Sequence, residues 1–342
     1  MTEIVGLDIG GAHLKLAQVR NRRVVDVRQL PCPLWQGLDK LFLALGQGFA
    51  GRAPPERIAV TMTGELADIF ANRAAGVRAI LDCLVAVAPG GKISTYTVDG
   101  RFASPEEAKS RPERVASANW HGTAKIAAAH CDEGLLLDIG STTTDVIPFR
   151  DGQVRARGTD DATRMTHDEL VYTGVVRTPV MAVARQLSFA GEHVGVMAEH
   201  FATMADVYRV TGQLPSHADQ HPSADGRGKS VSESRARLAR MIGFDFAMAS
   251  DLAWSALAHQ IAARQLEALE AACHRVLSAF LPAPDAPIVG AGVGRFIGEE
   301  LASRLRRPYR SVAALIPAEP AVAEAAADCA PSAAVALLLA EA

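Results

Sequence analysis

Cysteine is scarce in this 342-residue sequence, and no two cysteines form a C-x-x-C pair. The five that occur are scattered and odd in number: Cys32, Cys83, Cys131, Cys273 and Cys329. Such a set does not suggest a disulfide framework, and buried thiols in a reducing compartment are the simplest interpretation. A cytoplasmic protein is therefore expected.

The sequence also lacks a charge bias and long apolar runs. Lys and Arg number 35 against 38 Asp and Glu, so the basic excess of a nucleic-acid-binding or membrane-surface protein is missing. No apolar run reaches the roughly 18–20 residues that cross a bilayer. The N-terminus, with Glu3 and Asp8, has no basic region typical of a secretory leader. We expect a soluble enzyme of about two domains with no nucleic-acid or membrane partner.

The first third of the chain alternates apolar segments with turns. Residues 4–9 predict a strand that enters a glycine turn, and residues 14–19 and 24–27 predict two further strands. Apolar residues at helical spacing predict a helix over residues 38–49, and residues 58–62 predict another strand. This order is typical of the opening of a ribonuclease-H-like domain.

The second half begins with the same pattern. After an Ala- and Gly-rich helix at 116–130, residues 135–140 repeat the apolar strand and Asp-Ile-Gly of residues 5–10, about 130 positions later. Residues 180–280 predict mostly helix, and the polar segment 216–230 predicts an exposed loop. The chain ends with a strand at 287–289, a glycine cluster and a helix at 332–340.

The first hairpin offers phosphate-binding chemistry. Gly10 and Gly11 let the backbone approach a phosphate closely, and Asp8 at the strand end can hold Mg²⁺ through water. Lys15 adds a point charge for a phosphate. An ordinary glycine-rich hairpin with a salt-bridged lysine is the alternative.

The second hairpin strengthens the phosphate hypothesis. It supplies Asp138, a second glycine turn, hydroxyl donors and Asp145, which is a candidate to orient water or support the metal. The turn residues expected to bind phosphate are Gly140, Ser141, Thr142 and Thr143. Two such hairpins are able to hold a phosphate chain from opposite sides.

In chain order, the two hairpins and the cluster Gly290, Gly292 and Gly294 resemble the phosphate-1, phosphate-2 and adenosine motifs of the acetate and sugar kinase/Hsp70/actin superfamily. The resemblance implies an α/β chain of two ribonuclease-H-like domains, the actin-like ATPase fold, around a central cleft. The expected domains are 1–115 and 116–342, with a helical insertion at about 180–285 in the second. It also implies Mg²⁺ and, as a further ligand at the glycine cluster, ATP or ADP.

Within the superfamily the chain resembles the hydantoinase A/oxoprolinase branch. Segments 61–68, 118–124 and 172–179 are similar to a shorter subgroup linked to methanofuran and tetrahydromethanopterin one-carbon chemistry. Archaeal members of that subgroup join a furanylmethyl diphosphate to the phenol oxygen of γ-glutamyltyramine and release diphosphate. The resemblance implies a transferase for a small diphosphate ester and a tyramine- or tyrosine-derived phenolic acceptor.

For this chemistry the resemblance implies a role for each candidate residue. Asp8 and Asp138 serve the metal, and Lys15, Thr142 and Thr143 serve the phosphates. Either Glu65 or His121 takes the phenol proton, and substrate contacts fall to Asn119 and to Arg177, which is able to grip a carboxylate. Helix caps, packing contacts or ion pairs are the alternative roles for Glu65, His121 and Arg177.

Other functions and sites stay open. An ATP-dependent small-molecule kinase, an amide hydrolase like the wider branch and a nucleotide-gated partner protein are the alternatives. His217, Asp219, His221 and Asp225 offer a weak metal pattern, whereas residues 226–230 lack the first glycine of a P-loop. The apolar positions of 247–269 are expected to be core or a homodimer face.

Overall fold

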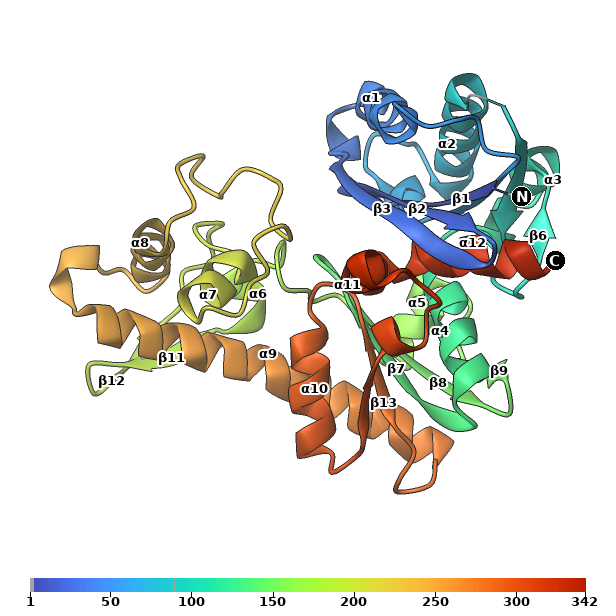
Figure 1. Cartoon of the computed structure of the whole chain (residues 1–342). Helices are drawn as coiled ribbons and strands as arrows, with labels where there is room; N and C mark the ends of the chain where they lie inside the picture. The colour runs from blue at the N-terminus through green and yellow to red at the C-terminus, as the bar shows by residue number, and fades with distance from the viewer. Residues whose placement is uncertain (1–2, 89) are drawn as a thin grey trace.

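The computed structural model describes residues 3–88 and 90–342, so residues 1, 2 and 89 of the expected first domain lie outside the described part. The first domain is built on a six-stranded sheet (Figure 1). Its order is β3 (Arg23–Pro31), β2 (His13–Arg20), β1 (Glu3–Ile9), β4 (Arg57–Met62), β5 (Lys92–Tyr96) and β6 (Phe102–Ala103). β2 is antiparallel to β1, and β4 is parallel to it, as the predicted ribonuclease-H-like order requires.

The second domain repeats this arrangement. Its sheet has the order β10 (Leu170–Val171), β8 (Thr144–Arg150), β7 (Glu133–Ile139), β13 (Ile288–Ala291) and β14 (Tyr309–Ser311), and β9 (Gln153–Val154) pairs with β8. β7 and β8 form an antiparallel hairpin, and β13 runs parallel to β7. The predicted internal repeat is thus a repeat of the same sheet core.

Helices pack on both sheets. α1 (Leu38–Phe49), α2 (Arg73–Val87) and α3 (Pro105–Ser110) belong to the first domain, and α5 (Asp161–Thr166), α10 (Arg295–Arg304) and α11 (Ala323–Asp328) follow later. α4 (Asn119–His130) and α12 (Ala330–Glu341) lie against each other between the two sheets (Figure 1). Small residues such as Ala333, Ala334 and Ala336 let α12 pack closely against β1, and they are fully buried.

The insertion is mostly helical, as predicted, and extends to one side of the molecule (Figure 1). It contains α6 (Val180–Val183), a hairpin of β11 (Gln186–Phe189) and β12 (Glu192–Gly195), α7 (Met204–Val210), α8 (Val231–Met241) and α9 (Asp251–Phe280). The last part of the region predicted to be mostly helix forms the single long helix α9. Its Trp254 is fully buried and stacks on Phe189 of the hairpin, in an apolar cluster that the insertion shares with β7, β8 and β13 of the second sheet.

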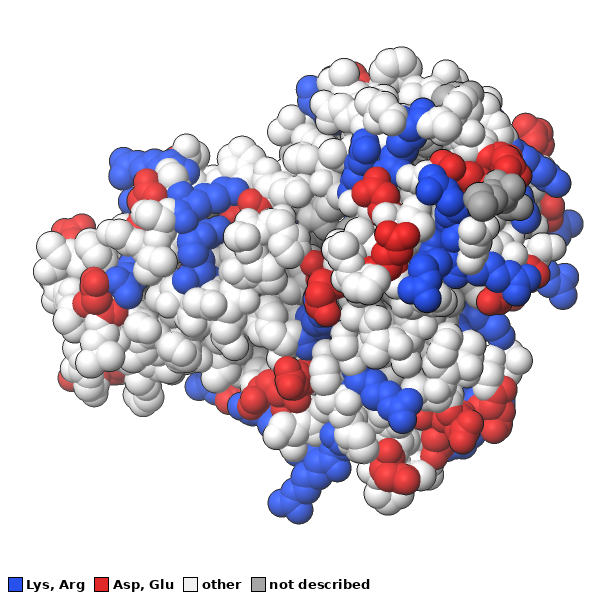
Figure 2. Space-filling model, in the orientation of Figure 1, with Lys and Arg blue, Asp and Glu red and all other residues white. Residues whose placement is uncertain are grey.

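Charges of both signs are interspersed on the face that Figure 2 shows, in line with the balanced composition. In the described residues, no single helix is both long and apolar enough to cross a bilayer. One strongly bent pair, Pro320–Asp328 with Ala330–Glu341, reaches that length and composition together.

Candidate active site

The two hairpin turns have the same local geometry. The N–H of Gly10 donates to the carbonyl of His13 at 2.9 Å, and the N–H of Gly140 donates to the carbonyl of Thr143 at 2.9 Å. Within the described residues, the turn N–H groups of Gly11, Ala12, Ser141 and Thr142 donate to no protein acceptor. Free N–H groups in a tight turn are suited to binding phosphate oxygens.

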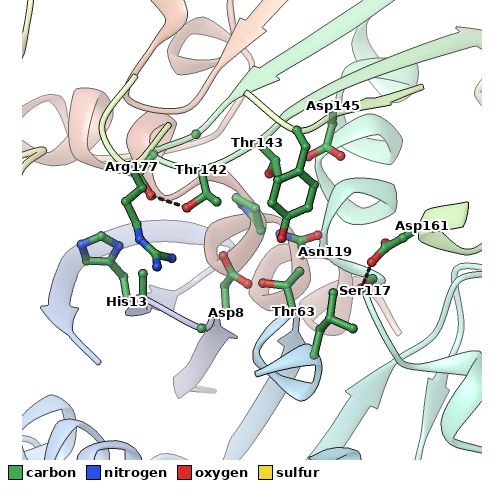
Figure 3. A pocket seen from close by; sticks show the side chains of 18 of the residues that line it. Asp8, His13, Thr63, Ser117, Asn119, Thr142, Thr143, Asp145, Asp161 and Arg177 are labelled. Carbon is green, nitrogen blue, oxygen red and sulfur yellow. Dashed lines mark hydrogen bonds between the residues drawn. The ribbon is translucent and has the colours of Figure 1, made fainter. Parts of the chain in front are cut away.

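Both turns open onto one cavity of about 520 Å³ between the domains (Figure 3). Most of the residues predicted from the sequence line it: Asp8, Gly10, Gly11, Lys15, Asn119, Asp138, Gly140, Ser141, Thr142, Thr143, Asp145 and Arg177. Residues that the sequence analysis did not single out as site residues also line it, among them His13, Trp35, Thr63, Ser117, Asp161, Arg164 and Tyr172. The central cleft that the family resemblance implied is therefore present as a cavity, and both hairpins line it.

Three buried aspartates dominate the charge of this cavity. Burial raises the pKa of Asp8, and the charge of Asp145 raises it further, while Lys15 and Asn119 act in the opposite direction. Burial together with Asp145 and Asp8 raises the pKa of Asp138 to about 7. The three carboxylates thus repel one another in a poorly solvated space.

A divalent cation fits this arrangement. Asp8 Oδ1 is buried and has no hydrogen-bond partner in the described chain, so a ligand oxygen is left unsatisfied. Residues 3–88 and 90–342 contain no cluster of three or more His, Cys, Asp or Glu that would enclose a metal. Mg²⁺ commonly binds through one or two carboxylates and keeps several waters, so the pair Asp8 and Asp138 suits it.

Lys15 stands opposite Asp8 in the β1–β2 ladder. Its Nζ lies 3.8 Å from Asp8 Oδ2. Burial lowers the pKa of Lys15, but the carboxylates of Asp8, Asp138 and Asp328 together outweigh that effect and raise it. Lys15 therefore stays charged inside the cavity, where it is able to bind a phosphate oxygen.

Asp145 is held by an arginine that sequence reasoning missed. Arg164 Nη2 donates to Asp145 Oδ1 at 2.6 Å and to the carbonyl of Glu169 at 3.0 Å. The guanidinium also stacks on the ring of Trp120, with 4.2 Å from Cζ to the ring centroid. The hydrogen bond from Arg164 fixes one carboxylate oxygen of Asp145. Arg164 is 19 residues away in sequence, and no local pattern links the two.

The two candidate proton acceptors occupy different places. Glu65 lies just behind the cavity wall and accepts a hydrogen bond at 2.9 Å from the hydroxyl of Ser117, which does line the cavity. Burial raises the pKa of Glu65 to about 7, and its Oε2 has no partner in the described chain. His121 is instead bonded to Tyr96 Oη at 2.9 Å and is not among the lining residues.

Ser117 has an unusual backbone. Its φ of 50° falls in the left-handed region, which non-glycine residues seldom adopt. The hydroxyl lies between two carboxylates, 2.9 Å from Glu65 Oε1 and 3.4 Å from Asp161 Oδ2. Strained backbone of this kind is concentrated at functional sites.

The glycine cluster packs behind the aspartates. A Cβ on Gly292 would lie 2.7 Å from Asp138 Oδ1, and one on Gly294 would lie 2.5 Å from a side-chain carbon of Ile139. Gly290 similarly has no room for a side chain beside Tyr309. The three glycines expected at a nucleotide are not among the lining residues of this cavity. Gly292 and Gly294 instead allow the segment after β13 to pack closely against the end of β7.

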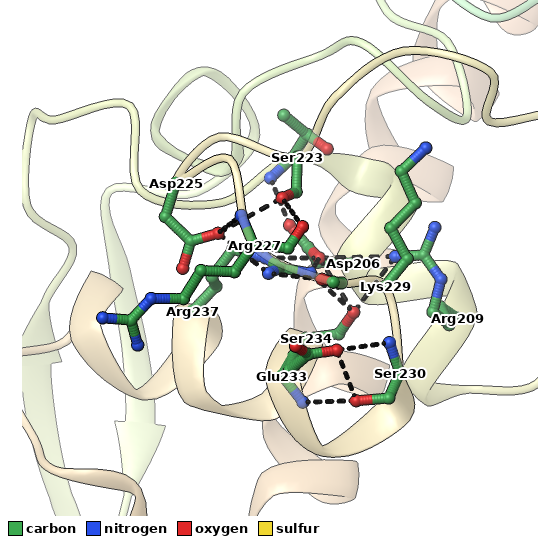
Figure 4. Close-up of polar contacts among 12 residues, drawn as sticks. Asp206, Arg209, Ser223, Asp225, Arg227, Lys229, Ser230, Glu233, Ser234 and Arg237 are labelled. Carbon is green, nitrogen blue, oxygen red and sulfur yellow. Dashed lines mark hydrogen bonds and ion pairs between the residues drawn. The ribbon is translucent and has the colours of Figure 1, made fainter.

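Residues 216–230, which we call the strap, cross from the insertion to the first domain. The predicted loop is present, but it is less exposed than expected because ion pairs anchor it: Asp219 binds Arg209 at 2.6 Å, and Asp225 binds the fully buried Arg237 at 3.1 Å (Figure 4). On the other side, His221 Nε2 lies 2.9 Å from the carbonyl of Ala12. The weak metal pattern in this segment is thus largely engaged in protein contacts.

Comparison with known proteins places the chain in a family. The hydantoinase/oxoprolinase family pattern matches residues 56–332. A curated protein of Methanocaldococcus jannaschii, (4-{4-[2-(gamma-L-glutamylamino)ethyl]phenoxymethyl}furan-2-yl)methanamine synthase, is 33% identical over 249 residues, which cover 72% of this chain and 74% of that protein. The protein of the same name from Methanococcus vannielii is 31% identical over 111 residues, 32% of this chain and half of that protein.

A solved structure confirms the fold. A nucleotide-free acetone carboxylase, from work on the mechanism of ATP-dependent acetone carboxylation, superposes with a TM-score of 0.52. The match has 11% identity and covers 87% of this chain and 67% of that chain. With two ribonuclease-H-like domains around a cleft and a family match over most of its length, the chain belongs to the hydantoinase/oxoprolinase family.

Proposed function

We propose that this chain is a transferase of methanofuran-type cofactor biosynthesis that condenses an aminomethylfuran-methyl diphosphate with the phenol oxygen of a tyramine- or tyrosine-derived acceptor. The product named for the two curated relatives contains this aryl ether, in which a phenol oxygen is joined to a furan-methyl carbon. The observation that carries the proposal is that two matching phosphate-type turns and three buried aspartates share one cavity.

The proposed reaction exchanges one C–O bond for another. The bond between the furan-methyl carbon and the diphosphate oxygen breaks, and its electron pair leaves with diphosphate. A lone pair of the phenol oxygen forms the new bond to that carbon, and the phenol proton passes to a base. The furan ring stabilises positive charge on its exocyclic carbon, so binding and stabilising the departing diphosphate is the main demand on the protein.

The residues of the two turns meet that demand in this proposal. The N–H groups of Gly11, Ala12, Ser141 and Thr142 and the ammonium of Lys15 bind diphosphate oxygens. Asp8 and Asp138 hold Mg²⁺, which when bound offsets the negative charge of the departing diphosphate. Asp145, fixed by Arg164, orients water beside this pair.

Glu65 is the base that the geometry favours. Its link to the cavity through the Ser117 hydroxyl gives a short route for the phenol proton, from the phenol to Ser117 Oγ and from Ser117 to Glu65. A pKa of about 7 suits a group that accepts a proton near neutral pH. His121 has no such route, because its Nδ1 is paired with Tyr96 and its ring lies off the cavity wall.

Diphosphate release that depends on a phenol is the decisive test. The purified chain is incubated with Mg²⁺, the aminomethylfuran-methyl diphosphate and γ-glutamyltyramine, with the O-methyl ether of the acceptor as the control that lacks a phenol proton. We expect diphosphate and an aryl ether in equal amounts, and neither with the control. ATP hydrolysis without any response to the furan compound would instead favour an ATP-dependent kinase or a hydantoinase/oxoprolinase-like amide hydrolase.

A further inference from the structure

The cavity is electrostatically divided. Figure 3 shows Asp161 and Ser117 on one side, His13 and Arg177 on the other, and Asp8 between them. The aspartates and the proposed metal account for the acidic part. The basic part has no role in the bond exchange, although it belongs to the same cavity.

Arg177 has a charge that the described chain does not neutralise. No carboxylate of residues 3–88 or 90–342 forms an ion pair with its guanidinium, which lies over the ring of Trp35 with 4.5 Å from Cζ to the centroid. Burial lowers its pKa, which reflects the cost of keeping this cation partly desolvated. Arg164 in the same cavity differs, because Asp145 pairs with it.

The backbone fixes where Arg177 stands. Its N–H donates to the carbonyl of Ser141 at 2.8 Å, so the residue is attached to the second phosphate turn. Its side chain reaches across to Trp35 and His13 of the first domain (Figure 3). An anion at this guanidinium therefore lies between the two domains.

His13 adds a second unsatisfied polar group. Its side chain lines the cavity and is 5% exposed, and its Nε2 has no hydrogen-bond partner in the described chain. Burial, His221, Lys15 and Arg177 lower its pKa to about 3, so the ring is neutral. A neutral imidazole next to a cation is able to donate a hydrogen bond to an oxyanion without adding repulsion.

The strap covers this corner. The ring of His221 lies 4.7 Å from that of His13 and 5.4 Å from that of Trp35, measured between centroids. Its Nε2 lies 2.9 Å from the carbonyl of Ala12, so a protonated Nε2 donates to the first phosphate turn. Through His221, the insertion thus packs against the basic corner.

We propose that His13, Trp35 and Arg177, closed by His221, form a subsite for the oxyanion at one end of a substrate. The proposal rests on the proposed function, which supplies two sources of such a group: the γ-glutamyl carboxylate of the acceptor and the terminal phosphate of the diphosphate ester. Both present oxygens that a guanidinium binds bidentately. The stack on Trp35 holds the planar guanidinium in a fixed orientation, which favours bidentate binding of two oxygens.

Calorimetric titration of the intact protein separates the two sources. The probes are γ-glutamyltyramine, tyramine, which lacks the carboxylate, and inorganic diphosphate with Mg²⁺. The variants are Arg177→Met and His13→Leu, with His13→Gln as a milder change, and the exposed residues Arg185 and His193 provide the controls Arg185→Met and His193→Leu. Thermal melting shows that each variant is folded, and quenching of Trp35 fluorescence, absent in Trp35→Phe, reports occupancy of the corner.

We expect Arg177→Met to weaken one anionic probe by about tenfold or more, the effect of losing a charge-assisted pair of hydrogen bonds, with a smaller loss in the His13 variants. Loss confined to γ-glutamyltyramine identifies the carboxylate as the source, and loss confined to diphosphate identifies the phosphate. Unchanged binding of both anions, or an equal loss for tyramine, would overturn the subsite.

The experiments distinguish an error in the proposed subsite from an error in the proposed reaction. If the wild-type chain forms no ether with any phenol but loses anion binding in Arg177→Met, the reaction is wrong and the subsite stands. If ether forms at the normal rate and with the normal KM in Arg177→Met, the subsite is wrong and the reaction stands.

Discussion

At the scale of single residues, the two hairpins differ in the residue that faces the aspartate of the first strand. Asp8 faces Lys15 across the first hairpin, and Asp138 faces Asp145 at the same ladder position of the second. The repeat therefore places one lysine against three aspartates in a single cavity. Arg164 pairs with Asp145, so the charge left for a divalent cation to neutralise is that of Asp8 and Asp138, which Lys15 offsets only in part.

Replacing either proposed metal ligand tests this charge balance. We expect Asp8→Asn and Asp138→Asn each to weaken Mg²⁺-dependent diphosphate binding by roughly a hundredfold, since each removes one of two carboxylates from the ion. Calorimetry with and without Mg²⁺ measures the effect. Asp132→Asn, which changes an exposed aspartate, is the control. Diphosphate binding that stays equally dependent on Mg²⁺ in both variants would contradict the assignment.

Glu65 sets an expected pH dependence of the reaction. A base with a pKa of about 7 is ionised, and able to accept the phenol proton, only as the pH rises through that value. The rate of ether formation should therefore rise tenfold per pH unit below about 7 and then level off. In Glu65→Gln we expect a lower kcat and a rate that no longer rises with pH below about 7. If the rise persists in Glu65→Gln, the pH dependence belongs to another group.

The same carboxyl group has a cost in stability. Folded protein keeps a proton on Glu65 that the unfolded chain releases above the ordinary glutamate pKa of 4.5, so stability falls as the pH rises from about 4.5 to about 7. Glu65→Gln should remove this penalty and raise the free energy of unfolding by up to roughly 3 kcal/mol at pH 8, with little effect at pH 4. Urea titrations at both pH values measure it, with the exposed Glu106→Gln as the control.

At the scale of elements, local sequence predicted the hairpins because their geometry is local. An apolar strand, a carboxylate and a glycine turn occur twice, and in each hairpin these neighbouring residues determine the conformation of the backbone. The same reasoning could not place His221 beside the first turn, because its contact with Ala12 spans 209 residues, and it could not find Trp35, which lies in a short helical turn. It also could not separate Glu65 from His121, because only the packed fold shows which one reaches the cavity.

One glycine outside both hairpins is expected to control the second turn. A Cβ on Gly174 would lie 2.5 Å from the backbone nitrogen of Thr142 and 2.6 Å from the carbonyl oxygen of Gly140. Gly174→Ala should displace this turn and weaken diphosphate binding by about tenfold or more. Gly46→Ala is the matched control, because this exposed helical glycine has no neighbour within 4 Å of a Cβ.

The two glycine variants should move stability in opposite directions. Alanine at Gly46 favours the helix and is expected to add about 0.5–1 kcal/mol, whereas alanine at Gly174 lowers the melting temperature. Thermal melting and calorimetry on the same samples give both readouts. Normal diphosphate binding in a folded Gly174→Ala protein would mean that the turn has room to shift.

At the scale of the whole molecule, the two domains are joined on one side by a shared core and on the other by polar contacts. α4 and α12 pack between the sheets, and their apolar side chains form one cluster with residues of both sheets. Across the cavity, Arg73 of α2 forms an ion pair with Asp161 of α5, and the strap reaches Ala12. The core side is thus suited to act as a hinge, and the polar side as the closure.

The Arg73–Asp161 pair makes closure measurable. Both side chains are partly exposed, so the pair should contribute at most about 1 kcal/mol to the closed state, and Arg73→Met should weaken diphosphate binding by up to about fivefold. Because the effect acts through one contact, Arg73→Met combined with Asp161→Asn should bind no more weakly than Asp161→Asn alone. Small-angle scattering should show a larger radius of gyration for ligand-free Arg73→Met than for Arg264→Met, which breaks an exposed pair within α9. Additive losses in the double variant would show that Arg73 acts on the ligand independently of Asp161, and the domains would then close without this pair.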